Sequence, residues 1–441
     1  MPNLSRSTGV PPAPNLRKFD EPSDVLYSVS ALCNAVLVLD RYLVISADGH
    51  AGADLLDYKP YLASKWHDEF DVWAAAYVNP FNDLVSPDAD RSWNSERRLR
   101  ETSADGIVAE VLFPNTVPPF FPSSNLTAPA PTAAEYERRW AGLQAHNRWL
   151  ADFCAATPGR RAGIAQILLN DVDDAVREIH WTKEAGLMGG ILLPGVAPGS
   201  GLPGLWDACY EPIWNACAEA DVTINHHSGA GLPELGYEGA ARAVMLIEIP
   251  QFSHRGLWHL IFSGVFERHP ALRFVLTEQG TGWIPGALRS LDWFYRRMDL
   301  EGSAENLFGG DVVAQLSMLP SEYFARNCYV GASFLRPVEC ELRYEVGIDR
   351  IMWGSDYPHS EGSYPYSREA LRATFAHVDE TELRIMLGET AAKVYGFDLD
   401  LLGPLAAELG PTVDEVAKPL ESYPADSTCN AFDEFAIIRA W

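Results

Sequence analysis

Short apolar runs recur along the chain from Tyr42 onward, and longer segments with helical spacing separate most of them. Eight such runs stand out, each a few residues long, as is typical of buried strands. In order along the chain they are YLVISAD, IVAEVLF, AGIAQILL, GGILLP, DVTINHH, RFVLTE, CYVGASF and RIMWGSD. Because parallel strands need long crossover connections, this alternation predicts an α/β fold with a parallel sheet.

Between these runs, apolar side chains return with the spacing of a helix. In the segment EYERRWAGLQAHNRWLADFCAAT, Tyr136, Trp140 and Leu143 fall on one helical face. The segment DVDDAVREIHWTKEAG begins with an aspartate that can cap a helix and stops at Gly186, a natural C-terminal cap. We therefore expect helices in the connections between the strands.

The number of strands decides between two parallel architectures. Eight strands close a TIM (β/α)8 barrel, and an open doubly wound sheet is the alternative. The open sheet is disfavoured because no GxGxxG motif follows the first strand and no phosphate-loop motif is present. We expect the barrel to span residues 42–401, with a partly disordered N-terminal extension over 1–41. We expect residues 402–441 to form a C-terminal arm that caps the barrel or contacts a second copy.

Composition and charge exclude several classes of function. The 441 residues carry a formal net charge of -26, which repels phosphate backbones and anionic membranes. The apolar piece ALCNAVLVL is too short to span a bilayer. The seven cysteines form no CxxC pair and their number is odd, so we expect a reducing, cytoplasmic environment. We expect a small-molecule substrate and neither a nucleic-acid nor a membrane partner.

Acidic and imidazole side chains gather where the predicted strands end. In a TIM barrel, chemistry takes place at the C-terminal ends of the strands. Taken alone, an aspartate after a strand is as often a helix cap. Here four separate strand ends carry such groups, which are of the types that bind a divalent metal or move protons. They are Asp48 and His50 in the first strand, His226 and His227 in the fifth, Glu278 after the sixth and Asp356 after the eighth.

Other residues can shape a pocket around these groups. The stretch FPNTVPPFFPSSN is rich in aromatic residues and proline, and the turn YPHSEGSYP follows the eighth strand. The residues that we place in this pocket are Trp93, Phe113, Asn115, Phe334 and His359. A further helical segment begins near His254 and Arg255, where its end can reach the barrel mouth, although a surface ion pair also explains these two residues.

Six segments resemble the amidohydrolase-related (amidohydrolase 2) family of metal-dependent TIM-barrel enzymes. They are VISADGH, ADGIVAEVLFPN, NHHSGAG, GVFERHPALRFVLTEQGTGWIP, WGSDYPH and LGETAAKVYGFD, and they extend from about Leu43 to Asp398. This family includes resorcylate-type and aminocarboxymuconate-semialdehyde decarboxylases and some carbon–carbon bond hydrolases. Together the segments are specific for this family, whereas of the single segments only SDYPH is specific.

The resemblance implies a metal centre at the barrel mouth. Its ligands fall on Asp48, His50 and Asp356, together with His227 or, as the alternative, His226. Binuclear members of the family bridge two metals with a modified lysine on strand four, where this chain reads GGILLPG. We therefore expect one divalent ion, with zinc first and manganese or iron as alternatives.

Two positions depart from the pattern of the family. Asp48 stands where relatives often have a histidine, which makes the metal site richer in oxygen. Glu278 stands where many relatives have a histidine. Because a carboxylate and an imidazole differ by about 2 pKa units, the second departure bears on proton transfer.

These residues favour a hydrolase over two alternatives. In the first reading, a metal-bound water attacks a small apolar or aromatic carbonyl substrate, and Asp356 moves the proton. Glu278 or His254 is then the second acid–base group, and Arg255 the partner of a substrate carboxylate. The first alternative is nonoxidative decarboxylation, a carbon–carbon lyase reaction at the same site. The second is a catalytically inactive binding protein, and in each case the tail and the aromatic helices favour a homodimer.

Overall fold

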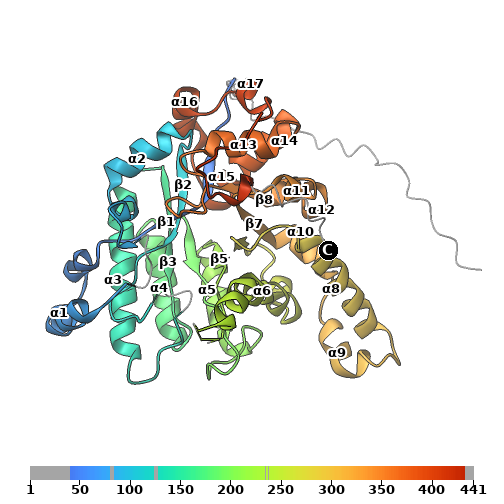
Figure 1. The fold of residues 1–441 in the computed structure, drawn as a ribbon. Coiled ribbons are helices and arrows are strands. Elements are labelled where there is room, and N and C mark those ends of the chain that lie inside the picture. Colours follow the sequence, from blue (N-terminus) through green and yellow to red (C-terminus); the bar gives the residue numbers. More distant parts are fainter. Residues whose placement is uncertain (1–39, 80–83, 124–127, 234, 237, 433–441) are drawn as a thin grey trace, which may run out of the picture. The chain divides into compact units, whose positions relative to one another are not determined.

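The computed structural model describes residues 40–432, with gaps at 80–83, 124–127, 234 and 237. At its centre eight parallel strands form a barrel in the order β1 to β8 (Figure 1). The strands are β1 (Ile45–Ala51), β2 (Ala109–Pro114), β3 (Arg161–Gln166), β4 (Gly190–Leu192), β5 (Ile224–His227), β6 (Phe274–Thr277), β7 (Cys328–Ser333) and β8 (Ile351–Gly354). Each coincides with one of the predicted apolar runs, so the TIM-barrel prediction is confirmed.

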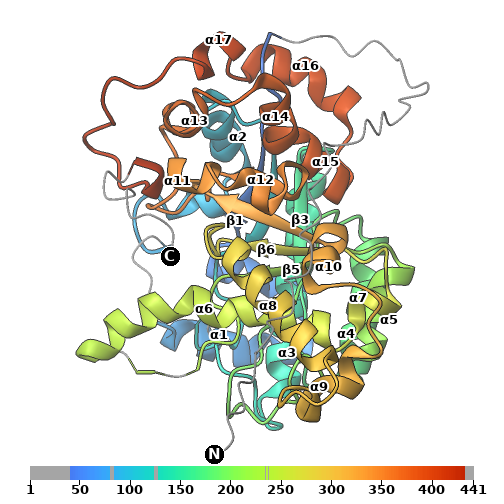
Figure 2. The same cartoon turned by 90° about the vertical axis from the view of Figure 1, so that its right-hand side faces the viewer.

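Helices occupy the connections and surround the strands (Figure 2). They are α1 (His67–Ala76), α2 (Ser95–Ala104), α3 (Tyr136–Ala155), α4 (Val172–Glu184), α5 (Glu211–Glu219), α6 (Ala240–Phe262), α7 (Val265–Arg268), α8 (Ile284–Asp299), α9 (Asn306–Val313), α10 (Pro320–Asn327), α11 (Pro337–Cys340), α12 (Arg343–Val346), α13 (Ser367–Phe375), α14 (Glu380–Arg384), α15 (Thr390–Tyr395), α16 (Leu399–Leu409) and α17 (Val413–Val416). The expected caps are present on α4, where Asp171 accepts from the Asp174 amide at 2.9 Å and Gly186 has a φ of +74°.

The strands are buried on both faces, which explains their continuous apolar sequences. Side chains on the inner face, among them Ile45, Val111 and Ile164, belong to one cluster that fills the barrel. Side chains on the outer face pack with the helices, as Ile191 and Ile224 do in a second cluster. Between them these two layers hold the strand ends in fixed positions.

The barrel closes between β1 and the segment after β8. The Asp356 amide donates to the Asp48 carbonyl at 2.9 Å, and the His50 amide donates to the Tyr357 carbonyl at 2.7 Å. The pairing of β1 with β2 shifts between Ser46 and Gly49, which is the signature of a bulge. The closing bonds therefore fall on residues at the predicted metal site.

The described part of the predicted arm packs on the barrel. Helix α16 begins at Leu399, and its residues Leu402 and Ala406 are buried in the same cluster as the inner face of the strands. The Tyr42 amide donates to the Pro411 carbonyl at 2.9 Å, which joins the start of the barrel to the arm. The predicted extension lies outside the described residues except for positions 40 and 41. Within the described ranges, no helix has both the length and the apolar character needed to cross a membrane.

Candidate metal centre and active site

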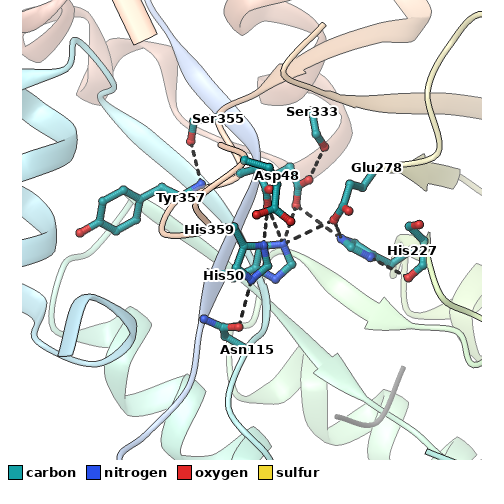
Figure 3. Close-up of polar contacts among 12 residues, drawn as sticks. Asp48, His50, Asn115, His227, Glu278, Ser333, Ser355, Tyr357 and His359 are labelled. Carbon is teal, nitrogen blue, oxygen red and sulfur yellow. Dashed lines mark hydrogen bonds and ion pairs between the residues drawn. The ribbon is translucent and has the colours of Figure 1, made fainter. Parts of the chain in front are cut away.

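Polar side chains from four strands meet at the C-terminal mouth of the barrel (Figure 3). They are Asp48 and His50 in β1, His227 at the end of β5, Glu278 directly after β6 and Asp356 two residues after β8. These residues come from positions up to about three hundred apart in the sequence, and barrel closure brings them together. All except Glu278, which is 23% exposed, are buried.

The ligating atoms lie within reach of one ion. Two overlapping groups have one ligating atom from each member within 4.8 Å of the others: Asp48, His50, His227 and Glu278, and His50, Glu278, Asp356 and His359. His50 Nε2 is 3.0 Å from Asp356 Oδ1 and 3.3 Å from Asp48 Oδ1. His227 Nε2 is 3.2 Å from Glu278 Oε2. Mixed imidazole and carboxylate ligands suit zinc, manganese or iron.

Four of these buried atoms lack a hydrogen-bond partner among the described residues. They are Asp48 Oδ1, His50 Nε2, His227 Nε2 and Asp356 Oδ2. Leaving such atoms unpaired in the interior costs free energy, so native proteins rarely do so. The other ring nitrogen of His227, Nδ1, lies 3.0 Å from the Ser228 carbonyl, which directs the Nε2 lone pair toward the cluster. A divalent cation at the cluster would give these atoms a partner, so the residues present fit the implied metal.

Two of the acidic residues have a positive φ, a backbone conformation that residues other than glycine rarely adopt. Glu278 has a φ of +56° and Asp356 a φ of +59°. Such conformations cost about 1–3 kcal/mol each and gather at functional sites. Glu278 directly follows β6, and one residue separates Asp356 from the end of β8.

The carboxyl groups differ in how their pKa values respond to the site. Burial, reinforced by the charges of Asp356 and Asp48, raises the pKa of Glu278 to about 8, although His227 acts in the opposite direction. Burial also opposes ionisation of Asp48, but the imidazoles of His227 and His50 hold its pKa below the usual range. Before any metal binds, the cluster therefore combines ionised aspartates with a glutamic acid that keeps its proton at neutral pH.

His359 links the aspartate of strand eight to the loop after β2. Its Nδ1 lies 2.9 Å from Asp356 Oδ1 and its Nε2 lies 3.1 Å from Asn115 Oδ1. The Asn115 amide nitrogen donates to Ser92 Oγ at 3.0 Å, which leaves the amide oxygen to accept from His359. Both ring nitrogens therefore act as donors. Although burial opposes a charge, Asp356 raises the pKa of His359 to about 10, which agrees with an imidazolium.

The adjacent histidines of β5 point to opposite faces of the strand. His226 Nδ1 lies 3.1 Å from the Leu193 carbonyl, and its ring fills the space beside Gly256 of α6, where a Cβ would come within 2.7 Å. Burial lowers the pKa of His226 to about 4. His227 belongs to the ligand group, whereas His226 packs between the strand and the helix layer.

The remaining predicted site residues lie at various distances from this group. The Phe113 ring centre is 4.7 Å from that of His227, so this side chain forms a wall of the site. His254 stacks on Trp283 with 3.7 Å between ring centres, and its Nε2 lies 3.2 Å from the Gln279 carbonyl. The described ligand groups do not include it. Arg255 lies over the Phe252 ring at 5.7 Å, and Trp93 and Phe334 pack against neighbouring apolar clusters.

The sequence analysis missed a residue at the end of strand seven. The Ser333 hydroxyl donates to Asp48 Oδ2, whereas Oδ1 of the same carboxylate has no hydrogen-bond partner among the described residues. Its position at a strand end was the one available signal, but a serine there is not distinctive. The bond fixes the orientation of the Asp48 carboxylate across the barrel.

Comparison with known proteins places this barrel in a family. A model of the family described as Amidohydrolase matches residues 71–397. The chain belongs to the amidohydrolase family. This match confirms the resemblance noted in the sequence. It also supports the prediction that the protein is an enzyme of the amidohydrolase superfamily.

This amidohydrolase is similar to curated decarboxylases. It is 30% identical over 248 residues to gamma-resorcylate decarboxylase of Rhodococcus jostii (strain RHA1). This alignment covers 53% of this chain and 71% of that protein. It is 27% identical over 272 residues to gamma-resorcylate decarboxylase of Polaromonas sp. (strain JS666 / ATCC BAA-500). This alignment covers 60% of this chain and 76% of that protein. These relatives are carboxy-lyases rather than hydrolases.

Solved structures confirm the fold of the amidohydrolase. The 5-carboxyvanillate decarboxylase of Sphingomonas paucimobilis superposes with a TM-score of 0.61 at 19% identity, over 81% of this chain and 100% of that one. A dihydroxybenzoic acid decarboxylase of Polaromonas sp. JS666, solved with manganese and the inhibitor 2-nitroresorcinol, superposes with a TM-score of 0.55 at 20% identity, over 81% and 98%. At such identities the likeness shows the shared barrel.

Proposed function

We propose that this amidohydrolase is a metal-dependent nonoxidative decarboxylase of hydroxylated aromatic carboxylic acids. The sequence analysis placed a hydrolase first, and the comparisons favour its decarboxylase alternative instead, because the curated relatives that match are gamma-resorcylate decarboxylases. The observation that carries the metal dependence is the set of four buried, unpartnered ligating atoms at the barrel mouth. The same set argues against a metal-free binding protein.

The proposed ion would be held by Asp48, His50, His227 and Asp356, whose ligating atoms lack hydrogen-bond partners, with Glu278 beside it. We place manganese ahead of zinc, because a site rich in carboxylates suits manganese and the solved decarboxylases include manganese complexes. When bound, the ion supplies the positive charge that holds the carboxylate and a neighbouring oxygen of the substrate. Zinc and iron stay alternatives that a metal analysis separates.

We assign the proton transfer to Asp356 and His359. The reaction adds a proton to the ring carbon and breaks its bond to the carboxylate, whose electron pair stays on that carbon while carbon dioxide leaves. Asp356 faces the cluster through Oδ2 and contacts the His359 imidazolium through Oδ1. The ionised Asp356 therefore takes a proton from His359 and passes it to the ring carbon. Glu278 lies beside the same cluster, 3.2 Å from His227 Nε2, and is the candidate for the second acid–base group.

The surroundings of the cluster suit an aromatic ring. Phe113 is fully buried and packs beside both His50 and His227, so the cluster has an aromatic neighbour on this side. Arg255 stays the predicted partner of a second substrate anion, and Trp93 and Phe334 stay predicted pocket residues. His254 stays a candidate acid–base group, and the homodimer and the cytoplasmic location also stay predictions.

The test is carbon dioxide release by the manganese-loaded protein. The substrates are benzoates with one or two hydroxyl groups beside the carboxyl, with amides and lactones as the hydrolase panel. In deuterated water, we expect deuterium at the vacated ring carbon, and Asp356→Asn should lower kcat by about 10²–10⁴-fold. Hydrolysis of an amide or lactone, with no carbon dioxide from any benzoate, would contradict the proposal.

A further inference from the structure

A buried ion pair lies behind the metal centre. Arg98 of α2 and Glu110 of β2 have side chains that are 0% and 4% exposed. Arg98 Nε donates to one Glu110 oxygen at 2.9 Å, and Nη2 donates to the other at 2.8 Å. Because side chains alternate along a strand, Glu110 lies on the face of β2 opposite to Phe113. The pair therefore sits between the barrel wall and α2, on the far side of the wall from the ligand group.

The remaining donors of Arg98 reach backbone carbonyls. Nη1 donates to the His50 carbonyl at 2.6 Å and to the Arg91 carbonyl at 3.3 Å, and Nη2 donates to the Tyr357 carbonyl at 3.4 Å. With the two bonds to Glu110, all five N–H groups of the guanidinium have an acceptor. The guanidinium carbon also lies 4.7 Å from the centre of the Tyr357 ring.

Two of these carbonyls belong to the seam that closes the barrel. His50 is itself a proposed ligand, and Tyr357 directly follows the ligand Asp356. The seam is held by the bond from the His50 amide to the Tyr357 carbonyl, which Arg98 Nη2 also approaches. Gly49 lies between the two ligands of β1, and a Cβ there would come within 3.1 Å of Nη2. Arg98 thus meets the chain at the point where the two ligand-bearing segments join.

We infer that the Arg98–Glu110 pair is a positioning element for the metal centre, which fixes the backbone of His50 and Tyr357 so that His50 and Asp356 face one another before a metal binds. This inference rests on the proposed metal-dependent function. A buried ion pair contributes little net stability, because desolvation offsets the attraction of the charges. A planar fork with five donors nevertheless holds several acceptors in one fixed geometry, which the compact ammonium of lysine cannot do.

Two variants of the full chain separate positioning from stability. Arg98→Lys keeps the charge opposite Glu110 but removes the fork. The double variant Arg98→Met with Glu110→Leu removes both charges, so no buried charge is left without a partner. The control is Arg161→Lys, because Arg161 is 3% exposed and also contacts α2, donating to Ser95 Oγ at 2.9 Å.

Two measurements are made on each protein after chelation. The first is the affinity for added manganese, from the electron paramagnetic resonance signal of the free ion. The second is hydrogen exchange over residues 48–51 and 355–359, which reports on the bond from the His50 amide. We expect both Arg98 variants to lose about 10–100-fold in manganese affinity, as substitutions beyond the ligands commonly do. We also expect faster exchange in both segments, with neither change in Arg161→Lys.

Wild-type affinity together with wild-type exchange in a folded Arg98 variant would overturn the inference. If both Arg98 variants fail to fold, Glu110→Gln, which keeps the shape of the side chain, decides by the same two measurements. Hydrogen exchange needs neither metal nor substrate. A wild-type protein that decarboxylates nothing therefore tells against the proposed function, whereas the exchange comparison still tests the positioning role.

Discussion

Glu178 in the helix layer and Asp48 at the barrel mouth are both buried carboxylates, 2% and 0% exposed, but their oxygens have different partners. Glu178 accepts from Asn147 Nδ2 at 2.8 Å, from Gln144 Nε2 at 3.1 Å and from Arg148 at both oxygens. Asp48 accepts from the Ser333 hydroxyl at one oxygen, and its other oxygen has no hydrogen-bond partner among the described residues. The first carboxylate has all its partners within the fold, whereas the second keeps one oxygen for the proposed cation.

A third buried carboxylate, Asp105, has fewer hydrogen-bond donors than Glu178 but leaves neither oxygen without one. It is 6% exposed and accepts the Ser367 amide at 3.2 and 3.3 Å, one N–H shared by two oxygens. Burial raises its pKa to about 6, despite the bonds from Ser367. The three carboxylates show that burial alone does not reveal a function, because the number and the source of the partners decide what each group does.

The largest expected effect is the loss of metal on removing two ligands. Asp48→Ala with His50→Ala should reduce the metal content from about one ion per chain to none. Glu178→Gln is the matched control, because Glu178 is equally buried but already has its partners within the fold. Plasma mass spectrometry of protein purified without chelator measures both. Equal metal content in the two proteins would remove the distinction drawn between these carboxylates.

Removing Glu178, whose partners all lie within the fold, should instead lower the free energy of unfolding. Glu178→Ala leaves Arg148 without its carboxylate, and the loss of one partner of a buried pair costs about 3–5 kcal/mol. Arg148 is 28% exposed, so we expect a value near the lower end, about 3 kcal/mol, from urea unfolding. The folded variant should bind manganese as the wild type does. A fall in metal affinity would mean that the contacts of Glu178 in the helix layer are coupled to the proposed metal centre.

Asp105 should make stability depend on pH. Its pKa in the folded protein is about 6, above the usual value near 3.9, so the folded state holds the proton more tightly than the unfolded state. The stability that this proton provides is present below pH ~4 and is lost as the pH rises through about 6. Asp105→Asn should therefore be more stable than the wild type by about 2–3 kcal/mol at pH 8, with little difference near pH 4. Urea midpoints across this range check the slope, and a constant difference would exclude Asp105 as its source.

The smallest effect is expected at the hydroxyl that orients Asp48. Ser333→Ala removes one hydrogen bond to the carboxylate, and we expect about a tenfold loss in manganese affinity with little change in stability. Ser321→Ala is the control, since Ser321 Oγ donates to Asp292 Oδ2 at 2.7 Å, in a pair formed between the helices α10 and α8. The same affinity in both variants would show that the carboxylate does not need this bond.

Much of the metal centre could be predicted because strand ends are visible in the sequence. Asp48, Glu278 and Asp356 each interrupt an apolar run at the point where a parallel strand reaches the barrel mouth. The sequence left His226 as an alternative to His227, since both are histidines at the C-terminal end of the same strand. What separates them is Gly256 of α6, which leaves the space that the His226 ring fills.

The local pattern of apolar residues by itself determined the eight strands, their parallel order and the edge at which the acidic and imidazole groups collect. It did so because burial on both faces of a strand is a property of a few consecutive residues. Only the tertiary structure decided the partners: Ser333 on Asp48, Asn115 on His359, and Arg98 on the carbonyls of His50 and Tyr357. A hydrogen bond depends on a distance of about 3 Å between atoms that lie far apart in the sequence, and that distance is set only when the barrel closes and the helices pack on it.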